Sequence, residues 1–311
     1  MDLFKIIQKS RAEKKLKKIT IDSYVRHIKL LNHNKEYENL DFLKHTEEIM
    51  NKIIMKKPTS IRNYITSVVV ALDSVDKEKY KESIDKYQII LKDLSKEINN
   101  NYGKKLKTDK ESKNWLTFEE LQEIQKKYKL EIDELNLNKK ETITPKNNKK
   151  LLYYLISSLY TLHAPLRLNW SDMEYVTDKK DIKNDDTKNY MYSQGKFTKI
   201  VYLNDYKTIK LYGKQTFKIN KELANIITLY KKFNTEKYLL YNTRGLKMSS
   251  NSLSKLLPLV FQKDGKHVNL NMIRKIKIAS IIDPKQVQKE KALAKEMLHS
   301  EETQKGVYMK D

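Results

Sequence analysis

Four residues in the second half of the chain have the chemistry to cleave a phosphodiester. Arg167 and Arg274 carry planar guanidinium groups, which bind phosphate oxygens in pairs. His299 can donate a hydrogen bond, and Tyr308, nine positions later, carries a phenol that can act as a nucleophile. Because two arginines stabilise the charge that develops on a phosphate under attack, this set predicts a phosphoryl-transfer site.

The charge of the chain predicts a polyanionic partner. The 311 residues include 63 Lys or Arg against 40 Asp or Glu, a formal net charge of +23. Residues 201 to 311 hold 22 of the basic residues and only 10 of the acidic ones. Since lysine and arginine release counterions when they neutralise phosphates, we expect nucleic acid as the partner.

Arginine is rare in this chain. The composition is rich in Lys, Asn, Ile and Tyr, which suggests an AT-rich coding sequence, under which arginine persists mainly where its bidentate fork is needed. Chance retention is the favoured explanation for Arg11 and Arg244. The six arginines are Arg11, Arg26, Arg62, Arg167, Arg244 and Arg274.

Cysteine is absent, which excludes disulfides, thiolate metal sites and cysteine nucleophiles. No apolar run approaches the roughly 20 residues of a membrane span, and Met1–Lys5 does not begin a signal peptide. We therefore expect a soluble, intracellular protein that acts at DNA and has no contact with membranes.

The pattern of apolar residues predicts a mainly α protein (α+β) with a small antiparallel β-sheet. Residues 1–100 predict a helical bundle, 101–113 a basic linker, and 114–311 a second domain. In the bundle, Ile21, Tyr24, Ile28 and Leu31 fall on one face of a helix. Helices are expected over 19–31, 39–55 and 80–98, and from Pro58 with a buried stripe of Ile61, Ile65, Val68 and Leu72.

In the second domain, Thr117 and Glu120 predict a capping box at the start of a helix. A buried helix over 151–162 would deliver Arg167 just beyond its end, because Pro165 stops it. Polar loops are expected over 131–149 and 176–196. A hairpin of strands 199–203 and 215–219 would carry Lys207 near its tip, and helices follow over 221–233, 250–261, 270–282 and 285–297.

Together, in this order, these features resemble the tyrosine recombinase (phage-type integrase) family. Met297-Leu298-His299-Ser300 is similar to the family's Leu-Gly-His-Ser box, and Tyr308 keeps the family's spacing to the histidine. The resemblance covers nearly the whole chain, since the first 100 residues are similar to the family's core-binding domain. The segments around Arg167 and Lys207 are most similar to divergent forms from large DNA viruses and their mobile elements.

The resemblance implies a role for each residue. Arg167 and Arg274 would hold the non-bridging oxygens of the scissile phosphate, and Tyr308 would attack it to leave a 3′-phosphotyrosine and a 5′-hydroxyl. Lys207 would protonate the leaving oxygen, and His299 would donate a hydrogen bond to the phosphate. It also implies double-stranded DNA as substrate, self-association on DNA as a dimer or tetramer, and a reaction without cofactor, metal or ATP.

The chain departs from the family at two places. The usual His-x-x-Arg reads Asn271-x-x-Arg274 here, and asparagine cannot accept a proton as a base. We interpret Asn271 as a tolerated substitution, with slowed or lost catalysis as the alternative. Only three residues follow Tyr308, where many members carry a helix that locks neighbouring subunits, so a tetramer would use another surface.

The sequence is compatible with three alternative functions. The first is a site-specific DNA recombinase or integrase. The second is a type IB topoisomerase, which shares the chemistry but acts as a monomer, and the third is a DNA-binding relative weakened by Asn271. Lys214 is the rival of Lys207 as the general acid, and His267 lies off the motif spacing.

Overall fold

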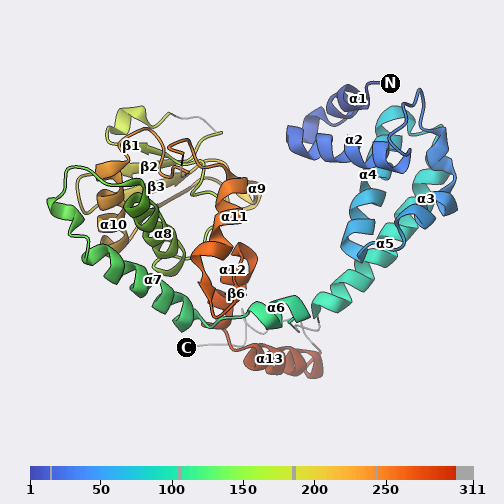
Figure 1. The fold of residues 1–311 in the computed structure, drawn as a ribbon. Coiled ribbons are helices and arrows are strands. Elements are labelled where there is room, and N and C mark those ends of the chain that lie inside the picture. Colours follow the sequence, from blue (N-terminus) through green and yellow to red (C-terminus); the bar gives the residue numbers. More distant parts are fainter. Residues whose placement is uncertain (15, 104–106, 184–186, 243, 299–311) are drawn as a thin grey trace. The chain divides into compact units, whose positions relative to one another are not determined.

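The computed structural model describes residues 1–14, 16–103, 107–183, 187–242 and 244–298, and the chain divides into two compact units (Figure 1). The N-terminal unit is Met1–Leu106 and the C-terminal unit is Lys107–Asp311. The described part is mainly helical with a small four-stranded sheet and a two-stranded one, which confirms the α+β class. His299 and Tyr308 lie outside the described residues.

The N-terminal unit is a bundle in which α4 packs against α1, α2 and α5. The expected stripe on α4, Ile61, Ile65, Val68 and Leu72, is buried, as are Ile21, Ile28 and Leu31 of α2. Its elements are α1 (Leu3–Ser10), a 3-10 helix (Ala12–Lys14), α2 (Lys18–Leu31), a 3-10 helix (Asp41–Lys44), α3 (Thr46–Ile53), α4 (Pro58–Asp76) and α5 (Lys81–Gly103).

The C-terminal unit has a larger core built around α8, which contacts α7, α10 and α11. Its helices are α6 (Asp109–Asn114), α7 (Phe118–Asp133), α8 (Pro145–Thr161), α9 (Ile209–Tyr212), α10 (Lys221–Phe233), α11 (Ser250–Val260), α12 (Leu270–Ala279) and α13 (Pro284–Glu296), with 3-10 helices Leu137–Lys139 and Lys179–Asp181. Its strands are β1 (Glu174–Val176), β2 (Tyr190–Ser193), β3 (Lys199–Leu203), β4 (Gln215–Lys218), β5 (Gln262–Lys263) and β6 (Lys266–His267).

The helix boundaries confirm some predictions and correct others. The capping box at Thr117 is present, since the Thr117 hydroxyl accepts from the Glu120 amide and the Glu120 carboxylate accepts from the Thr117 amide. The loop predicted over 131–149 is too long, because Thr144 caps α8 and Pro145 occupies its first turn, where a missing N–H costs nothing. The residues expected to form a linker are in part helical, since α5 continues to Gly103 and α6 begins at Asp109.

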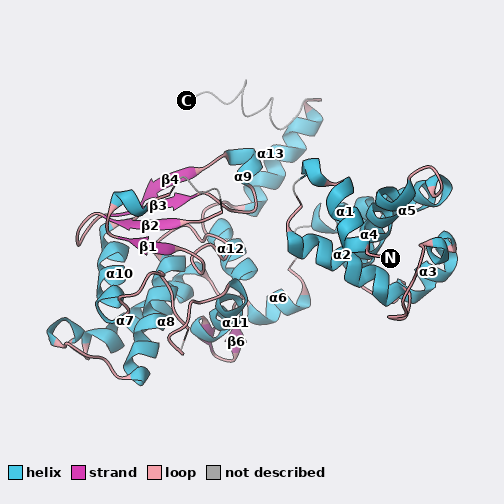
Figure 2. Ribbon diagram, turned by 90° about the horizontal axis from the view of Figure 1, so that it is seen from above, coloured by secondary structure: helices cyan, strands magenta, loops and turns pink. Residues whose placement is uncertain are grey.

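The main sheet has the order β1-β2-β3-β4 and is mixed rather than purely antiparallel. β1 pairs parallel with β2, whereas β2–β3 and β3–β4 are antiparallel. The predicted hairpin exists as β3–β4, and its connection carries the short helix α9. Strand β2 and the last residue of β1 fall within the segment predicted to be a polar loop, and they are strands because they pair with each other and bury Val176, Tyr190 and Met191. Figure 2 shows the four strands side by side, with α10 at one end of the strands and α9 at the other.

Within the part of the chain that the structure describes, no helix is both long enough and apolar enough to cross a bilayer.

Two buried lysines of the C-terminal unit should make its stability depend on pH. Lys199 is 1 % exposed and Lys231 is 7 % exposed, and within the described part of the chain each ammonium donates to backbone carbonyl groups and to no carboxylate. Burial lowers the pKa of both lysines to about 8. In the unfolded chain both stay protonated up to their ordinary pKa of 10.5, so the unfolded state binds more protons between these values.

We therefore expect the free energy of unfolding to rise as the pH increases from about 8 to about 10. Above that range it should fall, because burial raises the pKa of Tyr128 to about 12 and the tyrosines of the unfolded chain ionise first. Urea titrations at a series of pH values measure this, and Lys199→Met should flatten the rise. A stability that falls steadily between pH 8 and 10 would contradict the prediction.

Candidate active site

The segment that carries Arg167 leaves α8 and is anchored to the core on both sides. The buried Tyr160, near the end of α8, donates its hydroxyl to the backbone carbonyl of Arg167 at 2.9 Å. Three residues later, Trp170 is fully buried and packs edge-on against His163. The backbone of Arg167 is thus held while its side chain is exposed.

The same segment is tied to the start of α11. The hydroxyl of the fully buried Ser171 donates to the Leu168 carbonyl at 2.7 Å and lies 2.9 Å from the hydroxyl of Ser250. Asp172 accepts from Ser250 at 3.0 Å and forms an ion pair with Lys247 at 3.1 Å. Among the described residues, Asp172 therefore pairs with side chains on and just before α11 and with neither arginine.

A third set of hydrogen bonds joins this segment to the connection that carries Lys207. The Asn169 amide donates to the Asp205 carbonyl at 3.3 Å, and Asn189 donates to the same carbonyl at 2.9 Å. The Asn189 side-chain oxygen in turn accepts from the backbone amides of Asn204 and Asp205, both at 2.9 Å. Since Lys207 is two residues beyond Asp205, these bonds hold the stretch that leads to Lys207 beside the Arg167 segment.

Arg274 and Asn271 lie on α12, one turn apart. Asn269 caps this helix by accepting from the Met272 amide at 3.1 Å, and Met272 and Ile273 are buried in the core. Asn271 is exposed and Arg274 is half-buried. The spacing of three residues places the two on one face, as the sequence predicted.

The structure brings Arg167 and Arg274 together, although 106 residues separate them in the chain. Burial first, and the positive charge of Arg167 second, lower the pKa of Arg274 below its usual range. Charges separated by much more than about 10 Å are screened at physiological salt, so the charge of Arg167 acts on Arg274 from within about that distance. Among the described residues, neither guanidinium forms an ion pair with a carboxylate.

Two like charges held together without an acidic partner are costly unless an anion neutralises them. The geometry therefore suits a phosphate, whose oxygens accept paired N–H groups from arginine. Lys207 is exposed on the neighbouring connection and has the reach of a flexible four-carbon stem. In the described residues there is no group of three or more His, Asp or Glu side chains placed to hold a metal ion.

The other candidates fall outside this cluster. His267 donates its backbone amide to Asn114 at 3.0 Å, and its ring lies 3.2 Å from the Pro258 carbonyl, so it serves the small β5–β6 hairpin. Lys214 ends the connection whose beginning carries Lys207. The sequence missed Asn169 and Asn189, because an asparagine that organises a distant loop has no local signature.

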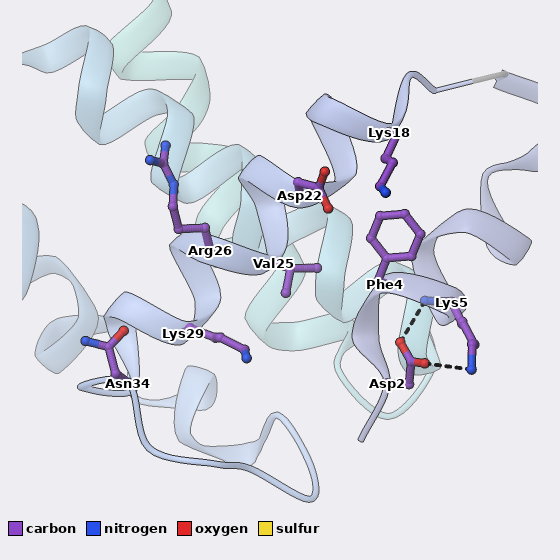
Figure 3. A pocket seen from close by; sticks show the side chains of 9 residues that line it. All are labelled: Asp2, Phe4, Lys5, Lys18, Asp22, Val25, Arg26, Lys29 and Asn34. Carbon is purple, nitrogen blue, oxygen red and sulfur yellow. Dashed lines mark hydrogen bonds and ion pairs between the residues drawn. The ribbon is translucent and has the colours of Figure 1, made fainter.

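The N-terminal unit carries a separate basic groove of about 560 Å³ (Figure 3). Asp2 accepts from the Lys5 amide and pairs with its ammonium at 3.1 Å, which neutralises one of the two acids. Lys18, Arg26 and Lys29 project from α2. The groove is lined by Asp2, Phe4, Lys5, Lys18, Asp22, Val25, Arg26, Lys29 and Asn34.

Searches of protein-family models, of curated proteins and of solved structures found no match to this chain.

Proposed function

We propose that this protein breaks and rejoins duplex DNA through a covalent 3′-phosphotyrosyl intermediate, as a site-specific recombinase or integrase of the tyrosine recombinase type. The observation that carries the proposal is the pair of neighbouring guanidinium groups, Arg167 and Arg274, with no carboxylate on either among the described residues. The adjacent Lys207 connection and the spacing of His299 and Tyr308 in the sequence add to it.

The chemistry follows from the roles of these groups. The phenol oxygen of Tyr308 would bond to phosphorus as the bond from phosphorus to the 5′ oxygen breaks, and the phenol would lose its proton to water. Arg167 and Arg274 would neutralise the charge on the non-bridging oxygens, and Lys207 would protonate the departing 5′ oxygen. Because the phosphotyrosyl bond conserves the free energy of the phosphodiester, the reverse attack by a 5′-hydroxyl reseals the strand without ATP.

The basic groove on α2 supports a role for the N-terminal unit in holding the duplex. Four of its lining side chains are cationic, Lys5, Lys18, Arg26 and Lys29, and one of these is paired with Asp2. Cationic side chains along a groove bind a phosphate backbone without reading sequence, and they make affinity fall steeply with salt.

A trapping experiment tests the proposal. The protein is incubated with nicked duplexes that tile the sequence on both sides of its gene, so that cleavage next to a nick releases a short strand and prevents resealing. We expect an adduct of protein and DNA that survives denaturing electrophoresis and disappears on protease treatment. Tyr308→Phe should abolish it, because phenylalanine has no nucleophilic oxygen.

Tyr153→Phe is the matched control, since Tyr153 is a half-buried tyrosine on α8 of the same unit with no role in the candidate site, and loss of its hydroxyl should leave the adduct unchanged. If no duplex of the set forms an adduct, or if Tyr308→Phe still forms it, the proposal is wrong.

A DNA-binding protein without cleavage activity is the second candidate, and Asn271 is the observation that favours it. Asn271 lies on the exposed face of α12 beside Arg274, where the family has a histidine, and it cannot act as a base. This function predicts salt-dependent binding to duplex DNA that Tyr308→Phe does not change, and no adduct.

A further inference from the structure

Two large apolar side chains stand side by side in solvent on α9. Leu211 is 73 % exposed and Tyr212 is 63 % exposed, and both belong to the connection between β3 and β4. Exposed apolar residues are common singly, and a neighbouring pair is a candidate for an interaction surface when its surroundings suit a partner.

The connection holds these side chains in place by its own hydrogen bonds. The Tyr206 hydroxyl donates to the Gly213 carbonyl across the base of α9, and the Gly213 amide donates to the Ile209 carbonyl at 2.7 Å. Gly213 has φ of 64°, a left-handed conformation that other residues adopt at a cost, and it turns the chain into β4. The exposed pair is therefore presented on an ordered turn.

The charge around the pair indicates what it meets. Residues 206 to 215 contain Lys207, Lys210 and Lys214 and no acidic residue. The connection begins at Asp205, which is bonded to Asn169 of the Arg167 segment. An apolar tip flanked by lysines, on a connection that is hydrogen-bonded to the Arg167 segment, complements a partner with an anionic exterior and an apolar interior, which describes the backbone and stacked bases of duplex DNA.

We propose that Leu211 and Tyr212 form a wedge that enters the minor groove beside the phosphate held by Arg167 and Arg274, and that it separates two stacked base pairs there. The inference rests on the proposed function for the position of that phosphate. Apolar side chains inserted from the minor groove unstack a base step and kink the duplex by about 20–90°. Bending at this point would present the phosphate to the arginines.

The wedge should affect DNA shape more than affinity. Burying two apolar side chains and unstacking one base step are opposing effects of similar size, so removing the wedge should weaken binding by about tenfold or less. The kink itself should be lost.

The test uses the full chain with Tyr308→Phe, which prevents cleavage, and an A·T-rich 30-base-pair duplex with a donor dye at one end and an acceptor at the other. Binding should raise energy transfer because the ends approach. The added double substitution Leu211→Ala and Tyr212→Ala should bind within about tenfold but return energy transfer to the value of free DNA. Leu130→Ala, which removes a side chain 65 % exposed on α7, is the control and should bend DNA normally.

Equal bending with and without the double substitution overturns the inference, as does binding by the parent protein without any bending. If the double substitution instead changes self-association in sedimentation and leaves bending intact, the pair contacts a second copy of this chain and the wedge is wrong. Bending that depends on Leu211 and Tyr212 supports the wedge even if no covalent adduct is found. In that case the wedge would stand and the proposed cleavage would be wrong.

Discussion

Replacing Arg274 with alanine should slow formation of the covalent adduct by about 10²–10³-fold, since each lost donor to a developing oxyanion costs this much. Arg274 is half-buried beside Arg167, so its charge acts on the phosphate with less screening by water than that of an exposed side chain. Single-turnover cleavage of the nicked duplex measures the rate. Affinity for intact duplex should change by less than about tenfold, because one phosphate contact among many is lost.

Two comparisons make this prediction specific. Arg274→Lys should recover little of the rate, because an ammonium is a point charge and lacks the paired N–H groups of a guanidinium. Arg244→Ala should leave the rate unchanged, since Arg244 is exposed and its backbone amide, which the substitution keeps, donates to the Asn242 side chain. If Arg274→Ala cleaves at the parent rate, Arg274 is not part of the active site.

Replacing Trp170 with alanine should lower the free energy of unfolding of the C-terminal unit by about 3–5 kcal/mol, the usual cost of deleting a buried aromatic side chain. Trp170 is 0 % exposed, packs in the core and stands three residues after Arg167. Its loss would leave a cavity under the segment that positions the arginine, so cleavage should also fall.

Urea unfolding followed by tryptophan fluorescence measures the free energy of unfolding of the C-terminal unit. The chain has two tryptophans, Trp115 and Trp170, and both belong to the C-terminal unit, so Trp115 remains as the reporter in the variant. Leu130→Ala is the control, since it changes an exposed side chain and should shift stability by no more than about 0.5 kcal/mol. A loss below about 1 kcal/mol for Trp170→Ala would show that the segment tolerates the cavity.

Much of the fold could be predicted because it is encoded locally. The apolar spacing of Ile61, Ile65, Val68 and Leu72 predicted the buried face of α4, and the pair Thr117 and Glu120 predicted where α7 begins. Strands β1 and β2 could not be predicted, since Glu174–Val176 and Tyr190–Ser193 are short and form a sheet only by pairing with each other and with β3. Short strands gain their stability from partners rather than from their own sequence.

The candidate site was likewise predicted in part from the sequence and determined in part by tertiary packing. Residue type named Arg167 and Arg274, the family resemblance named Lys207 and Asn271, and spacing linked His299 to Tyr308. Tertiary structure decided that the guanidinium groups of Arg167 and Arg274 lie close together with no carboxylate paired to either among the described residues, and that Asn169 and Asn189 hold the Lys207 connection beside the Arg167 segment. Such proximity depends on how α8, α12 and the sheet pack around a shared core, and no local pattern in the sequence contains that information.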